Sequence, residues 1–205
     1  NAFAGLVANK IGFPLGHLII ATNENDILSR AFNQGENKAG KVMMTPSPAM
    51  DIQVSSNFER HLFDCFKRDG DAMKKATSQI EKGEGLDLNT SILKSELGFI
   101  IAEGVSNGET LKSIKRVWDE YDEVIDPHTA VGMAAEDRHS NLAGISVVLS
   151  TAHPAKFPET VVDAIGFEPD IPNSLEGVFD RPEKFTTLEN DFTQLKDFVI
   201  KAKTK

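Results

Sequence analysis

The sequence is short of cysteine, of positive charge and of long apolar runs. Its 205 residues include one cysteine, so no disulfide can form within the chain. Cys65 lies in a helical pattern and is expected to be a structural thiol. No Cys and His spacing indicates zinc, and no metal is expected. No apolar run is long enough to cross a membrane, and no signal-peptide pattern opens the chain.

The charge balance also excludes classes of partner. Lys and Arg together number 22 and Asp and Glu 31, which gives a net charge of -9. A chain with this excess of negative charge is disfavoured as a partner of nucleic acid or of an anionic membrane surface. The first residue is Asn1, and Phe3, Leu6 and Val7 follow at helical spacing. Because the sequence opens inside a helical pattern, we expect further sequence upstream.

Helical and strand patterns alternate along the chain. Apolar runs predict strands over 17–22, 41–45 and 144–150, the last being the most apolar and β-branched. Helical spacing predicts helices over 1–12, 26–35, 58–66, 106–121, 126–138, 157–165 and 188–199. Ser106 and Glu109 fit a capping box. This alternation indicates an α/β fold with a mainly parallel sheet, including 17–22 and 144–150, flanked by helices.

Two polar segments follow predicted strands, where α/β proteins place ligands. They are residues 22–26 and 150–154. Each also fits a simpler role, since Asn and Asp often cap the next helix and a Ser-Thr pair often forms a turn. Residue patterns alone leave both roles open.

Histidines and one arginine are further candidates. His128 and His153 are accompanied by no nucleophile elbow and no metal-binding His pair, so a helix cap and a turn are favoured. Asn57 and Arg60 could cap a helix and form a solvated ion pair, or could face an anion at a helix N-terminus. Spacing does not choose between these two roles.

Five blocks in order resemble the threonine synthases of bacterial and fungal type. Together they cover most of residues 1–158, whereas 70–98 match poorly and the tail is less distinctive. The blocks are residues 21–28, 47–52, 55–60, 126–132 and 150–157. The resemblance implies a fold type II enzyme dependent on pyridoxal 5'-phosphate (PLP), of the tryptophan synthase β-like fold, in the cytoplasm. Such enzymes convert O-phospho-L-homoserine and water to L-threonine and phosphate.

The same resemblance locates the missing parts of such an enzyme. The lysine that forms the Schiff base with PLP belongs to an upstream Ser-Phe-Lys-Asp-like motif, which this sequence lacks. We therefore expect no catalytic residue in the chain and an inactive fragment, whose N-terminal half is the missing partner. The glycine-rich loop for the PLP phosphate would end just before Asn1. Lys156 is then expected to be a structural lysine.

Individual roles follow from the matched blocks. Ser150 and Thr151 correspond to the hydroxyl that faces the pyridine nitrogen, and Thr151 is favoured. A neutral hydroxyl there limits pyridinium character, which suits chemistry that needs charge at both the α and β carbons. His128 and Thr129 are expected to shape the cofactor pocket, and Gly132 to permit close packing.

Substrate contacts are expected from two other blocks. Asn57 and Arg60 are candidates for the substrate phosphate, because a guanidinium can bind it through two hydrogen bonds. Asn23 and Asn25 are candidates for the remaining substrate contacts. All these segments should converge on one concave face. The apolar residues that the missing N-terminal half leaves uncovered should make the isolated chain self-associate. A related PLP phospho-lyase and a non-catalytic binding lobe remain alternatives.

Overall fold

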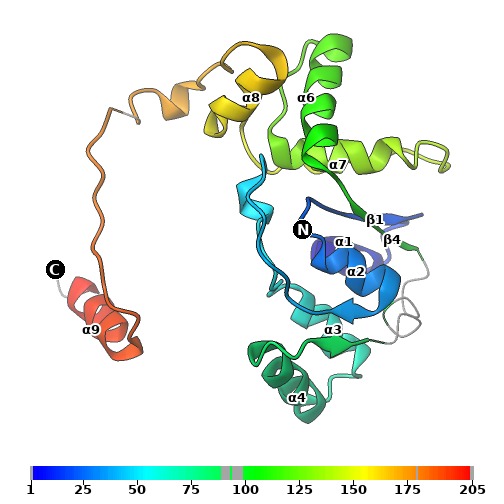
Figure 1. The fold of residues 1–205 in the computed structure, drawn as a ribbon, viewed down its shortest axis with the longest axis vertical. Helices are drawn as coiled ribbons and strands as arrows, with labels where there is room; N and C mark the ends of the chain where they lie inside the picture. The colour runs from blue at the N-terminus through cyan, green and yellow to red at the C-terminus, as the bar shows by residue number, and fades with distance from the viewer. Residues whose placement is uncertain (1, 89–92, 94–98, 179, 204–205) are drawn as a thin grey trace. The chain divides into compact units, whose positions relative to one another are not determined.

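The computed structural model describes residues 2–88, 93, 99–178 and 180–203 (Figure 1). The chain falls into two compact units, Asn1–Asp170 and Ile171–Lys205. The helices of the first unit are α1 (Ala2–Lys10), α2 (Ile27–Gln34), α3 (Phe58–Cys65), α4 (Gly70–Glu81), α6 (Asn107–Tyr121), α7 (Pro127–Asp137) and α8 (Pro158–Ile165). Among the described residues, no helix has the length and apolar character that a membrane span requires.

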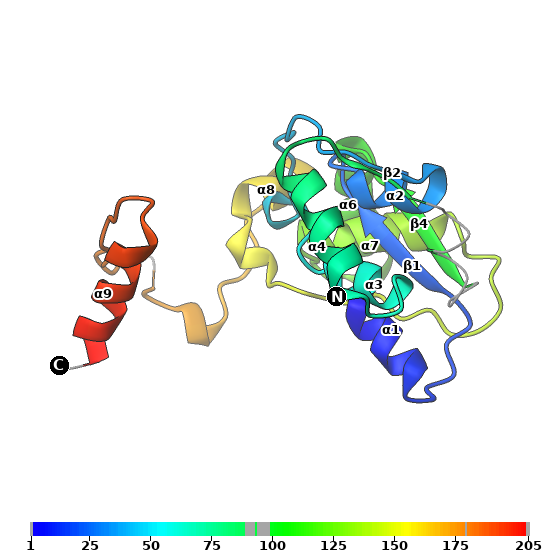
Figure 2. The ribbon, with the colours of Figure 1, turned by 90° about the horizontal axis from the view of Figure 1, so that it is seen from below.

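The sheet at the centre of the first unit is a parallel pair. β1 (Leu18–Thr22) runs beside β4 (Ile100–Gly104), with Leu18 opposite Ile100 and Thr22 opposite Gly104 (Figure 2). The short strands β2 (Glu36–Asn37) and β3 (Leu86–Asp87) pair antiparallel. The parallel pair and its flanking helices confirm the predicted α/β class and the strand predicted at 17–22. The sequence analysis did not assign β4.

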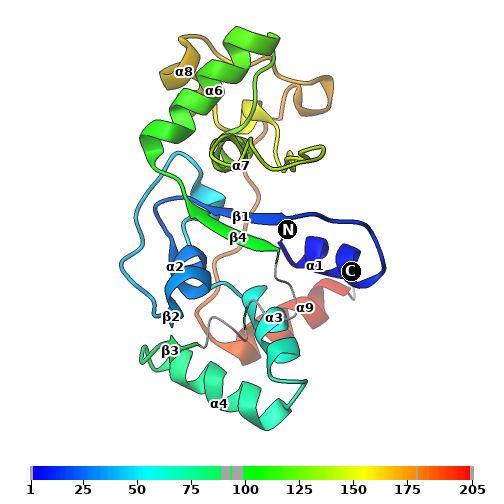
Figure 3. The ribbon, with the colours of Figure 1, turned by 90° about the vertical axis from the view of Figure 1, so that its right-hand side faces the viewer.

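Side chains of β1 alternate between two cores, as the two-residue period of a strand requires. Leu18 and Ile20 join a cluster with α1, α2 and α3, whereas Ile19 and Ala21 pack against Val131 and its neighbours on α7. Figure 3 shows α7 on one side of the strand pair and α1 and α2 on the other. The strands are therefore covered on both faces, as is usual for parallel strands.

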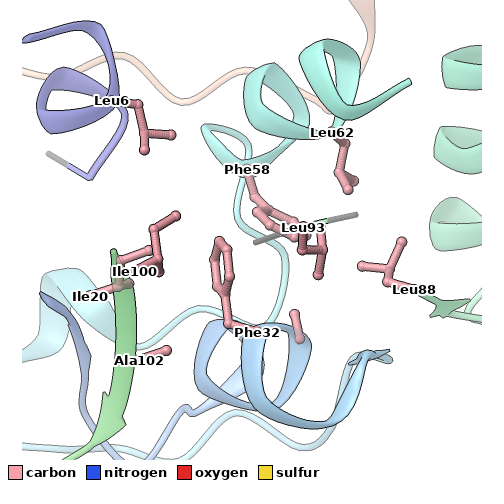
Figure 4. Close-up of a cluster of buried hydrophobic side chains, with 10 residues drawn as sticks. Leu6, Ile20, Phe32, Phe58, Leu62, Leu88, Leu93, Ile100 and Ala102 are labelled. Atoms are coloured by element: carbon pink, nitrogen blue, oxygen red, sulfur yellow. The ribbon is translucent and has the colours of Figure 1, made fainter. Parts of the chain in front are cut away.

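The larger core joins α2 and α3 to the strands (Figure 4). The Phe32 ring meets the Phe58 ring edge to face, with centroids 5.6 Å apart. Leu62 is fully buried beside them, and Leu6 closes the cluster from α1. Burial of each such side chain stabilises the fold by roughly 1.5–3 kcal/mol. This core fixes β1 in place, and thereby the polar residues that follow it.

Two predicted strands are wrong. Residues 41–45 are irregular, because side chains bind their backbone: Met43 N donates to Asn25 Oδ1 at 2.8 Å and Thr45 N to Asp51 Oδ2 at 3.0 Å. Residues 145–150 form no strand, since a strand needs a neighbouring backbone and they have none in the described chain. Ile145 is 95% exposed and Val147 79%.

The segment after Gly144 nevertheless approaches α7 closely. A side chain at Gly132 would place its Cβ 2.9 Å from Val148 Cγ1, which is closer than such contacts allow. Gly132 thus permits close packing, as predicted, although the neighbour is this non-helical segment. The half-buried Val148 lies toward α7 while the residues on either side of it face solvent.

The predicted helices are present, and capping residues at the N-termini of α6 and α7 stabilise them. Asp126 caps α7 by accepting from His128 N. Ser106 and Glu109 form the predicted capping box at the start of α6, and the box satisfies amides that would otherwise be unpaired. The Gly70–Glu81 stretch, which the resemblance covers poorly, is the twelve-residue helix α4.

The second unit contains a turn of 3-10 helix, Asn173–Leu175, and the helix α9 (Phe192–Lys203). α9 confirms the helix predicted near the end of the chain. Phe192 is 79% exposed and Leu195 and Val199 about half exposed, so the apolar stripe of α9 is not buried.

A charged network ties the end of β4 to α6 and α7. Arg138 bridges Glu103 and Glu109, and His139 Nε2 lies 2.8 Å from Glu103 Oε1. Hydrogen bonds from the Ser106 hydroxyl, from Arg138 and from the Ser106 backbone lower the pKa of Glu109 to about 2. The ionised carboxylate of Glu109 therefore favours the folded state.

We predict a pH-dependent stability loss in Glu109→Gln. Because the pKa of Glu109 is lowered on folding, its contribution is full above the unfolded value of about 4.5 and disappears as the pH falls toward about 2. The unfolding free energy of the variant should be lower at pH 7 and should converge on the original at low pH. Urea unfolding at several pH values measures this, with the solvent-facing Glu120→Gln as control. A pH-independent difference would contradict the prediction.

Candidate functional site

The carboxyl ends of β1 and β4 lie at the same edge of the sheet, because the strands are parallel. Asn23 and Asn25 follow β1 directly, and their residues are only 1% and 2% exposed. Buried amides of this kind need hydrogen-bond partners. The partners come from the segment between β2 and α3, residues 40–53.

Asn23 binds three residues of that segment. Its Nδ2 lies 2.7 Å from Thr45 Oγ1, 2.8 Å from Asp51 Oδ1 and 3.0 Å from Ser47 Oγ. Its Oδ1 accepts from Asn25 N at 2.9 Å. With two hydrogens on Nδ2, several acceptors share the same donor group. The amide of Asn23 is thus used to hold the protein's own backbone turn.

The Asn25 side chain binds the same segment, at Met43 and Asp51. Its Nδ2 donates to Met43 O at 2.8 Å and to Asp51 Oδ1 at 3.0 Å, and its Oδ1 accepts from Met43 N at 2.8 Å. The side chain therefore binds Met43 as a neighbouring strand would. We call the set that includes both asparagines the amide cluster, which consists of Asn23, Asn25, Thr45, Ser47 and Asp51.

A second polar group stands at the N-terminus of α7. Asp126 is fully buried, and its Oδ1 accepts from His128 N at 2.9 Å and from His128 Nδ1 at 2.8 Å. Its Oδ2 accepts from the Thr129 hydroxyl. Burial by itself would raise the pKa of Asp126, but the hydrogen bonds from His128 and Thr129 outweigh it and lower the pKa. Asp126 is accordingly an ionised acceptor.

The 3-10 turn η1 (Pro48–Met50) connects these two groups. Ala49 N donates to His128 Nε2 at 3.2 Å, and Met50 packs against the core that contains Val131. The His128 ring also meets the Phe157 ring, with centroids 4.7 Å apart. The structure thus brings the predicted residues Asn23, Asn25, His128 and Thr129 together through residues 45–51.

Ser150 and Thr151 lie at the end of the extended segment and are exposed. Within the described chain, neither hydroxyl has a hydrogen-bond partner, so both are open to a ligand. His153 caps the next turn, where its Nδ1 accepts from Ala155 N at 3.2 Å, in line with the turn favoured from the sequence. Lys156 is exposed in the same turn.

Asn57 and Arg60 lie on α3, which packs with α1 and α2. Asn57 is at the N-cap of α3 but makes no side-chain cap bond, and it is exposed. The Arg60 guanidinium lies over the Phe3 ring, 5.7 Å from its centroid. In the described ranges, neither residue shares a hydrogen bond with the amide cluster or with Asp126 and His128. Asn1 lies outside the described residues.

The sequence analysis gave no role to Thr45, Ser47 or Asp51. A usable signal was present, since Thr45 and Ser47 each precede a proline, and such a stretch predicts backbone that must find side-chain partners. Among the described residues, no group of three or more His, Cys, Asp or Glu side chains is placed to hold a metal ion. The site offers amide and hydroxyl groups together with the carboxyl groups of Asp51 and Asp126.

Comparison with known proteins shows where these features recur. The family model for the C-terminal part of threonine synthase matches residues 129–199. The threonine synthase of Pseudomonas aeruginosa is 40% identical over 97% of this chain, and that of Methylobacillus glycogenes is 35% identical over 98%. The chain spans 43% of the length of each of these relatives.

Solved structures agree with the sequence comparison. The PLP-bound threonine synthase from Brucella melitensis is 38% identical, with a TM-score of 0.82, over 97% of this chain and 43% of its own. The yeast threonine synthase is 32% identical, with a TM-score of 0.81, over 98% of this chain and 45% of its own. The similarity therefore extends across both the amide cluster and α7.

We predict that Asn23→Ala releases the 40–53 segment. The change removes the amide donor shared by Thr45, Ser47 and Asp51 and leaves the buried Asn25 N without its acceptor Asn23 Oδ1, at a cost of about 1–3 kcal/mol in unfolding free energy. Limited proteolysis should cut within 40–53 faster than in the original chain. Glu24→Ala is the control, because Glu24 is exposed and accepts only from Asn107 N at 3.2 Å. Equal effects of the two substitutions would contradict the prediction.

Proposed function

Because this chain belongs to the threonine synthase family, we propose that it is the C-terminal part of a PLP-dependent enzyme that converts O-phospho-L-homoserine and water to L-threonine and phosphate. One observation carries the proposal: enzymes of this name match nearly the whole chain at 35–40% identity. A cytoplasmic location is part of the same proposal. The cofactor lysine would come from an upstream segment.

The chemistry of the available donors fits PLP. The cofactor, when bound, supplies an electron sink for charge that develops on the substrate carbons. Thr151 and Ser150 offer neutral hydroxyls without partners in the described chain. A neutral hydroxyl can hydrogen-bond a pyridine nitrogen without forcing a full positive charge onto the ring. We propose that Thr151 has this role and that Ser150 lies beside it.

The cofactor phosphate is proposed to lie near Asn1 and the N-terminus of α1. The first amides of a helix have no partners within the helix, and the helix dipole favours negative charge there. α1 has no acidic residue in its first turn, so nothing on the helix itself repels an anion. His128 and Thr129 would border the ring from α7.

The substrate phosphate is proposed to contact Asn57 and Arg60. Both side chains are exposed at the start of α3, and a guanidinium binds phosphate through two hydrogen bonds. Asn23 and Asn25 are proposed to shape the substrate side through the segment 43–53 that they hold. No residue of this chain is proposed to carry out proton transfer, which falls to the upstream lysine.

We expect Thr151→Ala in the full-length enzyme to lower kcat about tenfold while PLP remains bound. The estimate corresponds to one hydrogen bond of about 1.4 kcal/mol that acts in the reaction. Threonine formation from O-phosphohomoserine, with PLP content measured separately, checks this. Ser146→Ala, on the same exposed segment, is the control.

The purified 205-residue chain with added PLP should form no threonine, since the proposed lysine is absent. Threonine formation by that chain would overturn the placement of the lysine. Release of phosphate by the full-length protein without threonine would favour the related phospho-lyase.

We expect the isolated chain to self-associate. Ile145, Val147 and Leu149 are 95%, 79% and 55% exposed, and Ile11 is 79% exposed. The missing N-terminal half is proposed to cover these residues, and exposed apolar surface promotes association when uncovered. Sedimentation over a range of concentrations should show oligomers that Val147→Lys reduces.

The control for that substitution is Val54→Lys, at a residue 54% exposed elsewhere on the surface. A chain that stays monomeric at all concentrations, and melts as high as the full-length enzyme, would show that these residues need no cover.

A further inference from the structure

Both ring nitrogens of His128 are used by the protein itself. Nδ1 lies 2.8 Å from Oδ1 of Asp126, and Nε2 lies 3.2 Å from Ala49 N. An ionised carboxylate can only accept a hydrogen bond, and a backbone amide can only donate one. The two partners together therefore require a proton on Nδ1 and a lone pair on Nε2, which is the neutral Nδ1–H tautomer.

The imidazole spans two elements that are far apart in sequence. Asp126 and His128 belong to the start of α7, whereas Ala49 belongs to η1. The His128 side chain is 7% exposed and that of Asp126 is fully buried. In this low-dielectric setting their hydrogen bond is stronger than it would be in water, and Asp126 fixes the orientation of the ring.

The other end of the same segment is fixed by the amide cluster. Asp51 accepts from Asn23 at 2.8 Å and from Asn25 at 3.0 Å, two residues after Ala49. Residues 45–51 thus have one anchor at the carboxyl end of β1 and a second at the N-terminus of α7. The packing of Met50 against the core that contains Val131 also holds η1 against α7.

We propose that His128 is a positioning residue that latches the 45–51 segment to α7 through Nε2, with Asp126 selecting the tautomer that can accept from Ala49. The latch sets the spacing between the end of β1 and the start of α7, where the substrate side of the proposed site lies. Its effect on catalysis rests on the proposed function, whereas the latch itself does not.

The tautomer can be measured without any substitution. Histidine-selective ¹⁵N labelling of the full-length protein should give His128 a protonated-type Nδ1 resonance and an unprotonated Nε2 resonance at neutral pH. His128→Gln identifies the signal by its disappearance. A protonated Nε2, or two protonated nitrogens, would overturn the proposal.

Two variants separate the two hydrogen bonds. The amide of an Asn side chain reaches the position of Nδ1, so His128→Asn can still donate to Asp126 but cannot accept from Ala49. The longer Gln side chain reaches the position of Nε2, so His128→Gln can accept from Ala49. Hydrogen exchange of peptides that contain residue 49 should be about fivefold to tenfold faster in His128→Asn, as for one lost neutral hydrogen bond.

The same peptides should stay close to the original exchange rate in His128→Gln. Equal rates in the two variants, with equal thermal stability, would overturn the latch. In the full-length enzyme, His128→Asn should raise KM more than it lowers kcat, since a displaced segment weakens ground-state and transition-state binding alike. If the enzyme forms no threonine but the exchange pattern holds, the proposed function fails and the latch stands.

Discussion

The arrangement of this site depends on the half-buried carboxylate of Asp51 and the two asparagine amides that bind it. Thr-Pro-Ser-Pro cannot form a strand or a helix through its middle, yet the segment lies against the buried end of β1. Its backbone groups must therefore be satisfied by side chains. Asn25 binds both polar groups of Met43, and Asp51 accepts from Thr45 N. These bonds turn an irregular segment into a fixed wall at the edge of the sheet.

This segment has a defined position because it is hydrogen-bonded to the residues that follow β1, and β1 lies between two apolar cores. One face of β1 packs with α1, α2 and α3 through Leu18 and Ile20, and the other packs with α7 through Ile19 and Ala21. Since both faces are covered, the position of Asn23 at the strand end is determined by apolar packing on each side. The hydrogen bonds of the amide cluster then hold residues 45–51 against the end of β1. The hydrogen bond from Ala49 to His128 holds the same residues against α7. The distance between the end of β1 and the start of α7 is thus fixed both by apolar packing and by hydrogen bonds.

Helix caps, which depend on residues close in sequence, could be predicted from the sequence, whereas the pairing of strands could not. The capping box of Ser106 depends on Glu109, three residues away, and is present as predicted. The helix predicted from Asp126 is also present, although its N-cap is Asp126, which accepts from His128 N, and not His128 as the sequence favoured. The apolar pattern of 144–150 does indicate an extended chain, but a strand also needs a second backbone beside it, which the described chain does not provide. β4 shows the converse, because Ile100–Gly104 was not assigned from its sequence and is a strand through its pairing with β1.

The site shows the same division between local and distant partners. The sequence assigned His128 and Thr129 to a cofactor pocket only through the resemblance to threonine synthases. It could not show that Ala49, 79 residues earlier, donates to the far nitrogen of the imidazole. The local cap determines half of that contact, since the carboxylate of Asp126 requires a proton on Nδ1, and the Ala49 amide then requires the lone pair on Nε2. The Asp126 cap therefore orients the imidazole of His128 at the start of α7, and what the fold adds is the backbone amide of Ala49, which donates to Nε2.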